Sequence, residues 1–196
     1  MIYLVRHGET VWNEISRLQG RLDSPLTPRG MQQAHAIGET LRREIKNIND
    51  VCIETSDLGR ARETARIIAN VIGMSLAAIV LTPLLVEHDF GDWQGLTHSQ
   101  VDELYPGARA KRQDRKWTYS IPNGESYALV AVRARKWLSA PRYARTTIAV
   151  THEMTSRTIQ GLYLALTEEE TLARTHLHHR IYRLRDGCID EVSGQS

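Results

Sequence analysis

The sequence has little cysteine, with only Cys52 and Cys188 in a chain of 196 residues. The two form no CxxC pair, which excludes a disulfide framework and a zinc knuckle. Histidine is more frequent, but His176, His178 and His179, which lie close together, lack a metal-ligand spacing on a clear helix and have no carboxylate partners. We therefore expect no metal site and no other cofactor.

Net charge is also small, at +2 with the histidines neutral. So low a charge does not indicate a nucleic-acid-binding protein. One basic run, 109–119, contains five Lys and Arg residues together with Trp117 and Tyr119. A steep salt dependence of binding would identify this run as a nucleic-acid patch. Because no nucleic-acid-binding fold accompanies it, we favour a lid over an anionic substrate.

Long apolar runs are missing as well. No stretch approaches the roughly 18 apolar residues that a membrane span needs, and no apolar signal-peptide core follows Met1. The sequence has no internal repeat and no low-complexity segment. We therefore expect a cytoplasmic protein with no membrane partner, and the sequence leaves a homodimer open.

Short apolar runs of strand length alternate with helical stripes along the chain. Strands are expected at 2–5, 51–53 and 147–151, with a shorter peripheral one at 79–81. A closing hairpin is expected around Asp186-Gly187, a dipeptide typical of tight turns. This alternation predicts an α/β fold, a three-layer αβα sandwich whose central sheet is mostly parallel and has helices on both faces.

The helices between these strands have recognisable ends. Thr27 and Pro28 suit the N-cap and first position of a helix whose stripe runs from Met31 to Ile45. Ser56 is expected to cap the next helix, with Asp57 in its first turn, and Gly73 to end it. Further helices are expected over 124–138 and after His152, the latter with a stripe that reaches Leu166.

The length suits one domain over 1–196. Its least patterned stretch is 97–123, where only a short helix near 101–105 is expected. We interpret 97–123 as a small lid insertion.

Each of the three main strands is followed by a side chain suited to phosphate. Arg6 and His7 follow the first strand, Arg60 lies one turn into the helix after the second, and His152 follows the third. Singly, Arg60 fits a solvated helix face and His152 a capping or core histidine. Because the carboxyl ends of parallel strands meet in one crevice, we expect them to lie together. Arginine matches phosphate oxygens, and a neutral imidazole is a nucleophile.

The motifs around these residues resemble those of the histidine phosphatase superfamily, the phosphoglycerate mutase-like proteins. Four blocks follow one another in the family's order, and a fifth segment resembles a further block; they are Arg6-His7-Gly8-Glu9-Thr10 with Trp12-Asn13, Ser56 to Ala65, Glu87 to Gly95, Val150-Thr151-His152, and Pro122 to Ser126. The resemblance covers residues 1 to about 165.

The resemblance implies roles for single residues. His7 would attack the phosphoryl group and carry it, and Arg60 would hold it, with Arg6 and His152 beside its oxygens. Glu87 would be the proton donor. Asn13, Gln19 and Gly20 resemble positions at which the family contacts its substrate.

Two departures from the family bear on function. Glu153 stands after the second histidine, where glycine is usual; in the crevice it would select among anionic substrates, but we favour a role at the helix N-terminus. The lid is shorter than in true mutases, which favours release of the phosphoryl group to water. We therefore expect a metal-independent phosphomonoesterase that acts on a small phosphorylated metabolite through a phosphohistidine. A phosphoglycerate mutase-type transferase and a non-catalytic phospho-ligand-binding protein are the alternatives.

Overall fold

The order of the strands brings the functional segments together. In the computed structural model, which describes residues 1–142 and 144–192, six strands form one sheet in the order β3-β2-β4-β1-β5-β6. Three pairings are parallel (β3 with β2, β2 with β4, β4 with β1) and two are antiparallel (β1 with β5, β5 with β6). The strands are β1 (Ile2–Arg6), β2 (Val51–Thr55), β3 (Ile79–Leu81), β4 (Thr146–Thr151), β5 (Ile181–Arg185) and β6 (Cys188–Val192). Residues 143 and 193–196 of the predicted domain lie outside the described residues.

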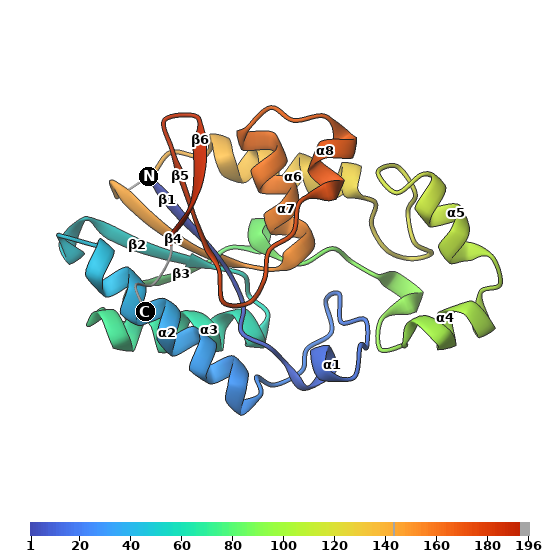
Figure 1. Ribbon diagram of the computed structural model, residues 1–196, viewed down its shortest axis with the longest axis horizontal. Helices are drawn as coiled ribbons and strands as arrows, with labels where there is room; N and C mark the ends of the chain where they lie inside the picture. Colours follow the sequence, from blue (N-terminus) through green and yellow to red (C-terminus); the bar gives the residue numbers. More distant parts are fainter. Residues whose placement is uncertain (143, 193–196) are drawn as a thin grey trace.

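Helices cover both faces of this sheet, as Figure 1 shows. One face carries α2 (Pro28–Glu44) and α3 (Gly59–Ile72), and the other carries α6 (Tyr127–Ser139), α7 (Glu153–Tyr163) and α8 (Glu168–Ala173). The predicted α/β fold with a mostly parallel central sheet is therefore confirmed.

Strand β1 shows why both faces need cover. Its side chains alternate between the two layers, so Tyr3 and Val5 pack in the cluster with α2 and α3, whereas Ile2 and Leu4 pack in the cluster with α6 and α7. All four are buried. Burial of one such side chain stabilises the fold by about 1.5–3 kcal/mol, which anchors β1 at the centre of the sheet.

Helix α3 begins later than predicted. Its N-cap is Leu58, whose side chain makes no cap bond, so neither Ser56 as a cap nor Asp57 in the first turn is correct. Ser56 instead lies on the loop after β2, where its hydroxyl accepts from the Leu58 amide. A residue distant in sequence provides the acceptor that a capping side chain would supply: Asp23 accepts a hydrogen bond from the Arg60 amide at 3.3 Å.

The helix stripes need two corrections. Met31 is exposed, because it lies in the first turn of α2 beside a surface hollow lined by Pro25 and Leu26. Leu166 lies beyond α7, which ends at Tyr163 before Ala165 adopts a left-handed φ of 53°. Helix α6 begins at Tyr127, after the Ser126 cap, so the predicted start at 124 is wrong. Three other predicted ends hold: Thr27 caps α2, Gly73 closes α3 with φ 80°, and Asp186 and Gly187 form the β5–β6 turn with φ 51° and 77°.

Residues 97–123 project from one end of the sheet (Figure 1). They contain α4 (His98–Leu104) and α5 (Ala108–Asp114), and α5 was missed because the sequence there is basic and lacks an apolar stripe. The helix α1 (Val11–Glu14) and α8 were also missed. A separate apolar cluster of Phe90, Trp93, Val101 and Ile121 anchors this lid on the 83–95 loop.

Candidate active site

The three predicted strand ends meet at one edge of the sheet. Strand β4 lies between β1 and β2, and the backbone amide of His7 continues the ladder by donating to Thr151 at 2.9 Å. The rings of His7 and His152 therefore face each other, with 5.1 Å between their centroids. Arg60 reaches the same place from the first turn of α3, where its Nε lies 3.3 Å from His7 Nε2. The structure thus brings together Arg6, His7, Arg60 and His152.

His7 presents an unprotonated nitrogen to this crevice. Its Nδ1 lies 2.7 Å from the carbonyl oxygen of Gly8, and since a carbonyl only accepts, Nδ1 carries the proton. Nε2 then keeps its lone pair and faces the Arg60 N–H. Burial and the neighbouring positive charge of Arg60 hold the pKa of His7 well below its usual range. The ring is therefore neutral at physiological pH, as a nucleophile must be.

Close packing of the backbone requires glycine at position 8. A Cβ at this position would lie 2.3 Å from the carbonyl oxygen of Gly30, in the first turn of α2. The Gly8 amide also donates to the hydroxyl of Thr64 on α3 at 3.0 Å. Glycine is needed because the nucleophile loop packs directly against two helices.

Arg60 is buried, and backbone carbonyls fix its guanidinium. Nη2 donates to Gly20 at 2.7 Å, and Nη1 donates to Leu22 at 2.8 Å and pairs with Asp23 at 3.1 Å. These bonds leave the Nε edge directed at His7. The loop 20–23 therefore aims Arg60, a role that its polar sequence did not reveal.

His152 is fully buried at the N-cap of α7. In the described part of the chain, neither of its ring nitrogens has a hydrogen-bond partner. Burial and then the charge of Arg60 lower its pKa well below the usual value. An uncommitted N–H beside His7 can donate to a phosphoryl oxygen.

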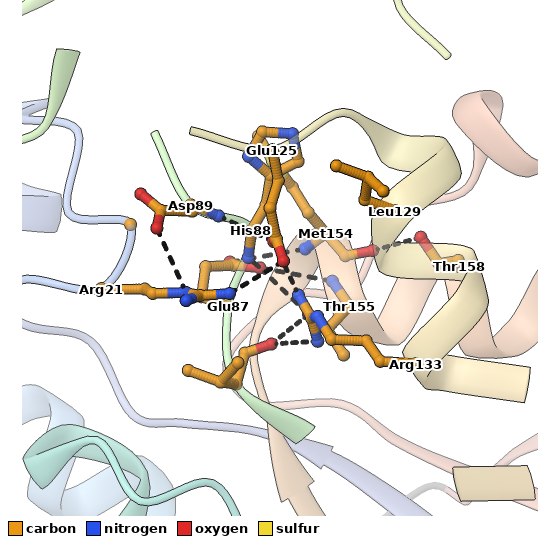
Figure 2. A network of polar contacts seen from close by, with 12 residues as sticks. Arg21, Glu87, His88, Asp89, Glu125, Leu129, Arg133, Met154, Thr155 and Thr158 are labelled. Atoms are coloured by element: carbon orange, nitrogen blue, oxygen red, sulfur yellow. Dashed lines mark hydrogen bonds and ion pairs between the residues drawn. The ribbon is translucent and has the colours of Figure 1, made fainter. Parts of the chain in front are cut away.

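Glu87 lies against the first turn of α7, as Figure 2 shows. Its carboxylate accepts from the amides of His88 at 2.8 Å, Thr155 at 3.3 Å and Met154 at 3.5 Å. Its charge also acts on Arg6 and Arg60, which places the carboxylate at the same crevice. The side chain is almost fully buried, with 8% of it exposed.

A second arginine holds the loop that carries Glu87. Arg133 of α6 donates to the carbonyl of Val86 at 2.6 Å. It also pairs with Glu125 at 3.3 Å (Figure 2). Glu125 also pairs with Arg21 at 2.8 Å, and Arg21 with Asp89 at 3.4 Å. The segment 122–126, which resembles a further block of the family, therefore supports the candidate acid.

Glu153 lies in the first turn of α7, as the favoured interpretation expected, and it also forms two ion pairs. Its two oxygens pair with Arg6 and Arg157, each at 2.9 Å. It therefore points toward the crevice and links the arginine beside the nucleophile to one on the lid side.

The three predicted substrate contacts serve local structure in this state. Asn13 Oδ1 accepts from the Thr10 amide at 3.1 Å, and Gln19 donates to the Thr10 hydroxyl at 2.8 Å. Gly20 contributes its carbonyl to Arg60 and has a φ of 54°. Asn13 lies in α1, and Gln19 and Gly20 lie in the loop that follows it.

Sequence reasoning missed Asp23, Thr155, Arg157 and His178. Of these, His178 contacts the nucleophile most directly, with its ring 5.3 Å from the His7 ring and its Nδ1 donating to the His7 carbonyl at 2.6 Å. Only the 153–157 spacing of an acid and a base, four residues apart on one helix, was readable from the sequence.

No group of three or more His, Cys, Asp or Glu side chains among the described residues could hold a metal ion. Nor is any helix between residues 1–142 or 144–192 both long and apolar enough to cross a membrane.

Comparison with known proteins gives a consistent family. Residues 2–186 match the family described as the histidine phosphatase superfamily (branch 1). A curated relative from Erwinia tasmaniensis, named "Probable phosphoglycerate mutase GpmB", is 36% identical over 99% of this chain and 85% of its own length. One of the same name from Enterobacter sp. is 39% identical over 70% of this chain and 61% of its own.

Solved structures show the same fold. A mycobacterial glucosyl-3-phosphoglycerate phosphatase, solved as a complex with VO3, is 30% identical with a TM-score of 0.78 over 92% of this chain and 88% of that chain. Bacillus stearothermophilus YhfR is 29% identical with a TM-score of 0.79 over 96% and 93%.

Proposed function

The chain belongs to the histidine phosphatase superfamily as a histidine-type hydrolase of phosphoric monoesters, and we propose that it acts on a small phosphorylated metabolite without a metal. The phosphoryl group is transferred first to His7 and then to water. One observation carries the proposal. His7 is buried and neutral, and its free Nε2 faces the Nε–H of Arg60.

In the first step, the lone pair of His7 Nε2 attacks phosphorus, and the bond from phosphorus to the substrate's ester oxygen breaks. The guanidiniums of Arg6 and Arg60 and the N–H of His152 stabilise the three non-bridging oxygens as charge is redistributed. Glu87, protonated at this stage, gives its proton to the departing oxygen. The products are a free alcohol and a phosphohistidine.

In the second step, water replaces the alcohol beside the phosphohistidine. The Glu87 carboxylate takes a proton from the attacking water, whose oxygen bonds to phosphorus while the N–P bond breaks. The electron pair of the N–P bond returns to His7 Nε2, and inorganic phosphate leaves. Two fixed arginines supply the positive charge that a metal supplies elsewhere, so no step requires a metal.

The test is the covalent intermediate. Wild-type protein quenched during turnover should carry phosphate that is stable in base and labile in acid, and His7→Ala should carry none and lose turnover. Labelling should proceed in excess EDTA. His35→Ala, which removes an exposed histidine, is the matched control and should label normally. Substantial turnover in His7→Ala, or loss of labelling in EDTA with rescue by Mg²⁺ or Zn²⁺, would contradict the proposal.

A mutase is the second candidate, because both curated relatives reported above bear that name. It predicts conversion of 3-phosphoglycerate to 2-phosphoglycerate in the presence of a 2,3-bisphosphoglycerate primer. A phosphatase instead releases inorganic phosphate, with or without the primer. A cytoplasmic location and a homodimer remain predictions from the sequence.

A further inference from the structure

A cavity of about 650 Å³ lies between the lid and the start of α7. Met154 and Arg157 line it from α7, and Arg109, Arg112 and Lys116 line it from the lid. It borders the candidate active site, because the Met154 amide donates to Glu87 and Arg157 shares Glu153 with Arg6. A substrate whose phosphoryl group lies at His7 would place its leaving group here, in a volume typical of small-molecule sites.

The wall of this cavity gathers like charges. Burial lowers the pKa of Lys116, and the charges of Arg157 and Arg112 lower it further. Burial likewise lowers the pKa of Arg112, with Arg157 acting in the same direction. Three cations therefore lie close enough to repel one another, which is unfavourable unless an anion joins them.

The carboxylates of the neighbourhood are already engaged. Asp102 pairs with Arg109 at 2.5 Å, and Glu153 is shared between Arg6 and Arg157. Among the residues that the structure describes, no carboxylate lies within ion-pairing distance of Arg112 or Lys116. The cavity therefore retains an excess of positive charge.

Two of these side chains also have unused donors. Arg157 is 7% exposed, with Nη1 donating to the Tyr127 hydroxyl at 3.1 Å and Nη2 engaged by Glu153. Its Nε, together with Nε and Nη2 of Arg112, has no acceptor within the described ranges. Buried guanidinium N–H groups are normally satisfied, so these donors point to an acceptor that arrives with the substrate.

We infer that the leaving group of the substrate carries a second anionic group, a carboxylate or a phosphate, which binds in this cavity between Arg112, Lys116 and Arg157. The inference rests on the proposed function, because it places the first phosphoryl group at His7. A sugar or alkyl phosphate whose leaving group is uncharged would leave the three cations unneutralised.

Matched substrates test the inference. 3-Phosphoglycerate and glycerol 3-phosphate differ at the distal carbon, which is a carboxylate in the first and a hydroxymethyl group in the second. Phosphate release should show kcat/KM at least about tenfold higher for 3-phosphoglycerate. Fructose 1,6-bisphosphate against fructose 6-phosphate tests a second phosphate in the same way, and a preference in either pair supports the inference.

Substitutions of the cavity residues test whether the preference for a second anionic group arises there. Arg112→Gln and Lys116→Gln should each reduce this ratio of kcat/KM values by about tenfold, because each lowers kcat/KM for the substrate with the second anionic group more than for its partner. Arg115→Gln removes the same charge from an exposed lid position outside the cavity and should leave both values unchanged. Circular dichroism identifies a cavity variant that has not folded, and in that case the other cavity variant provides the test.

The outcomes separate this inference from the proposed function. Equal kcat/KM within both pairs, with p-nitrophenyl phosphate still hydrolysed and His7 still labelled, would overturn the inference alone. An equal fall of the ratio in Arg115→Gln would assign the preference to the general field of the lid and would also overturn it. No labelling of His7 with any substrate would overturn the proposed function.

Discussion

At the scale of single residues, Glu87 has the most demanding role. In the proposed mechanism it holds a proton for the leaving oxygen and then accepts one from water. The backbone amides of residues 154 and 155 direct its carboxylate, and Arg133 holds the preceding carbonyl of Val86. Its position is therefore set by α7 and α6 together with the neighbouring His88 amide of its own loop.

Glu87→Gln should reduce kcat by about 10²-fold or more for an alkyl phosphate. The loss should be far smaller for p-nitrophenyl phosphate, because its leaving group departs with little protonation. Steady-state kinetics on both substrates measures the difference. Equal losses on the two substrates would assign Glu87 to binding or structure.

The rival carboxylates provide the controls. Asp89 pairs with Arg21, Asp92 accepts from Asn123 at 2.9 Å, and Glu153 lies between two arginines. Each amide variant should show no such dependence on the leaving group. If Glu153→Gln showed it instead, the acid would be Glu153.

At the scale of elements, helix α3 joins the two halves of the candidate site. It presents Arg60 in its first turn, and one turn later Thr64 accepts from the Gly8 amide and donates to the Arg60 carbonyl. One hydroxyl thereby holds both the loop of the proposed nucleophile and the arginine proposed to bind phosphate.

Thr64→Val should therefore disturb both the loop that carries His7 and the position of Arg60. It leaves the buried Gly8 amide without an acceptor, which should reduce the free energy of unfolding by about 1–3 kcal/mol. Displacement of His7 should reduce kcat by about tenfold or more. Urea unfolding and p-nitrophenyl phosphate kinetics measure the two effects. Thr64→Ser retains the hydroxyl and should retain most of kcat, and a fully active Thr64→Val would show that the bond does not position His7.

The element scale also shows what the sequence could predict. The central strands, α2 and the hairpin follow from local apolar patterns, capping and turn residues, and the strand ends follow from the parallel sheet. The aspartate that caps α3 could not be predicted, because Asp23 is distant in sequence and approaches only in the folded chain. His178 was missed for a similar reason: the antiparallel register that pairs Val5 with Ile181 brings it to His7.

At the scale of the whole molecule, the fold buries several histidines in neutral form. Burial lowers the pKa of His88 and of His176 to about 3, from 6.5. Between these values the unfolded chain binds protons that the folded protein cannot, so stability falls as the pH drops below 6.5. His7 and His152 act in the same direction.

Acidification from pH 7 to pH 5 should therefore reduce the free energy of unfolding by about 2 kcal/mol for each of His88 and His176. Urea unfolding at a series of pH values measures this loss. His88→Leu should reduce the pH dependence, whatever its effect on stability at pH 7, and the exposed His35→Asn should not. An unchanged free energy of unfolding between pH 7 and pH 5 would contradict the prediction.

The central position of β1 has a consequence for biosynthesis. Among the strands of residues 1–142 and 144–192, its neighbours in the sheet are β4 and β5, and β4 begins at Thr146. On the ribosome, the apolar segment 2–5 must therefore wait while residues 7–145 are added, on the order of ten seconds at about 5–20 residues per second. Nascent chains throughout that interval expose the strand that later carries the nucleophile. We therefore expect this segment to be a binding site for chaperones during synthesis.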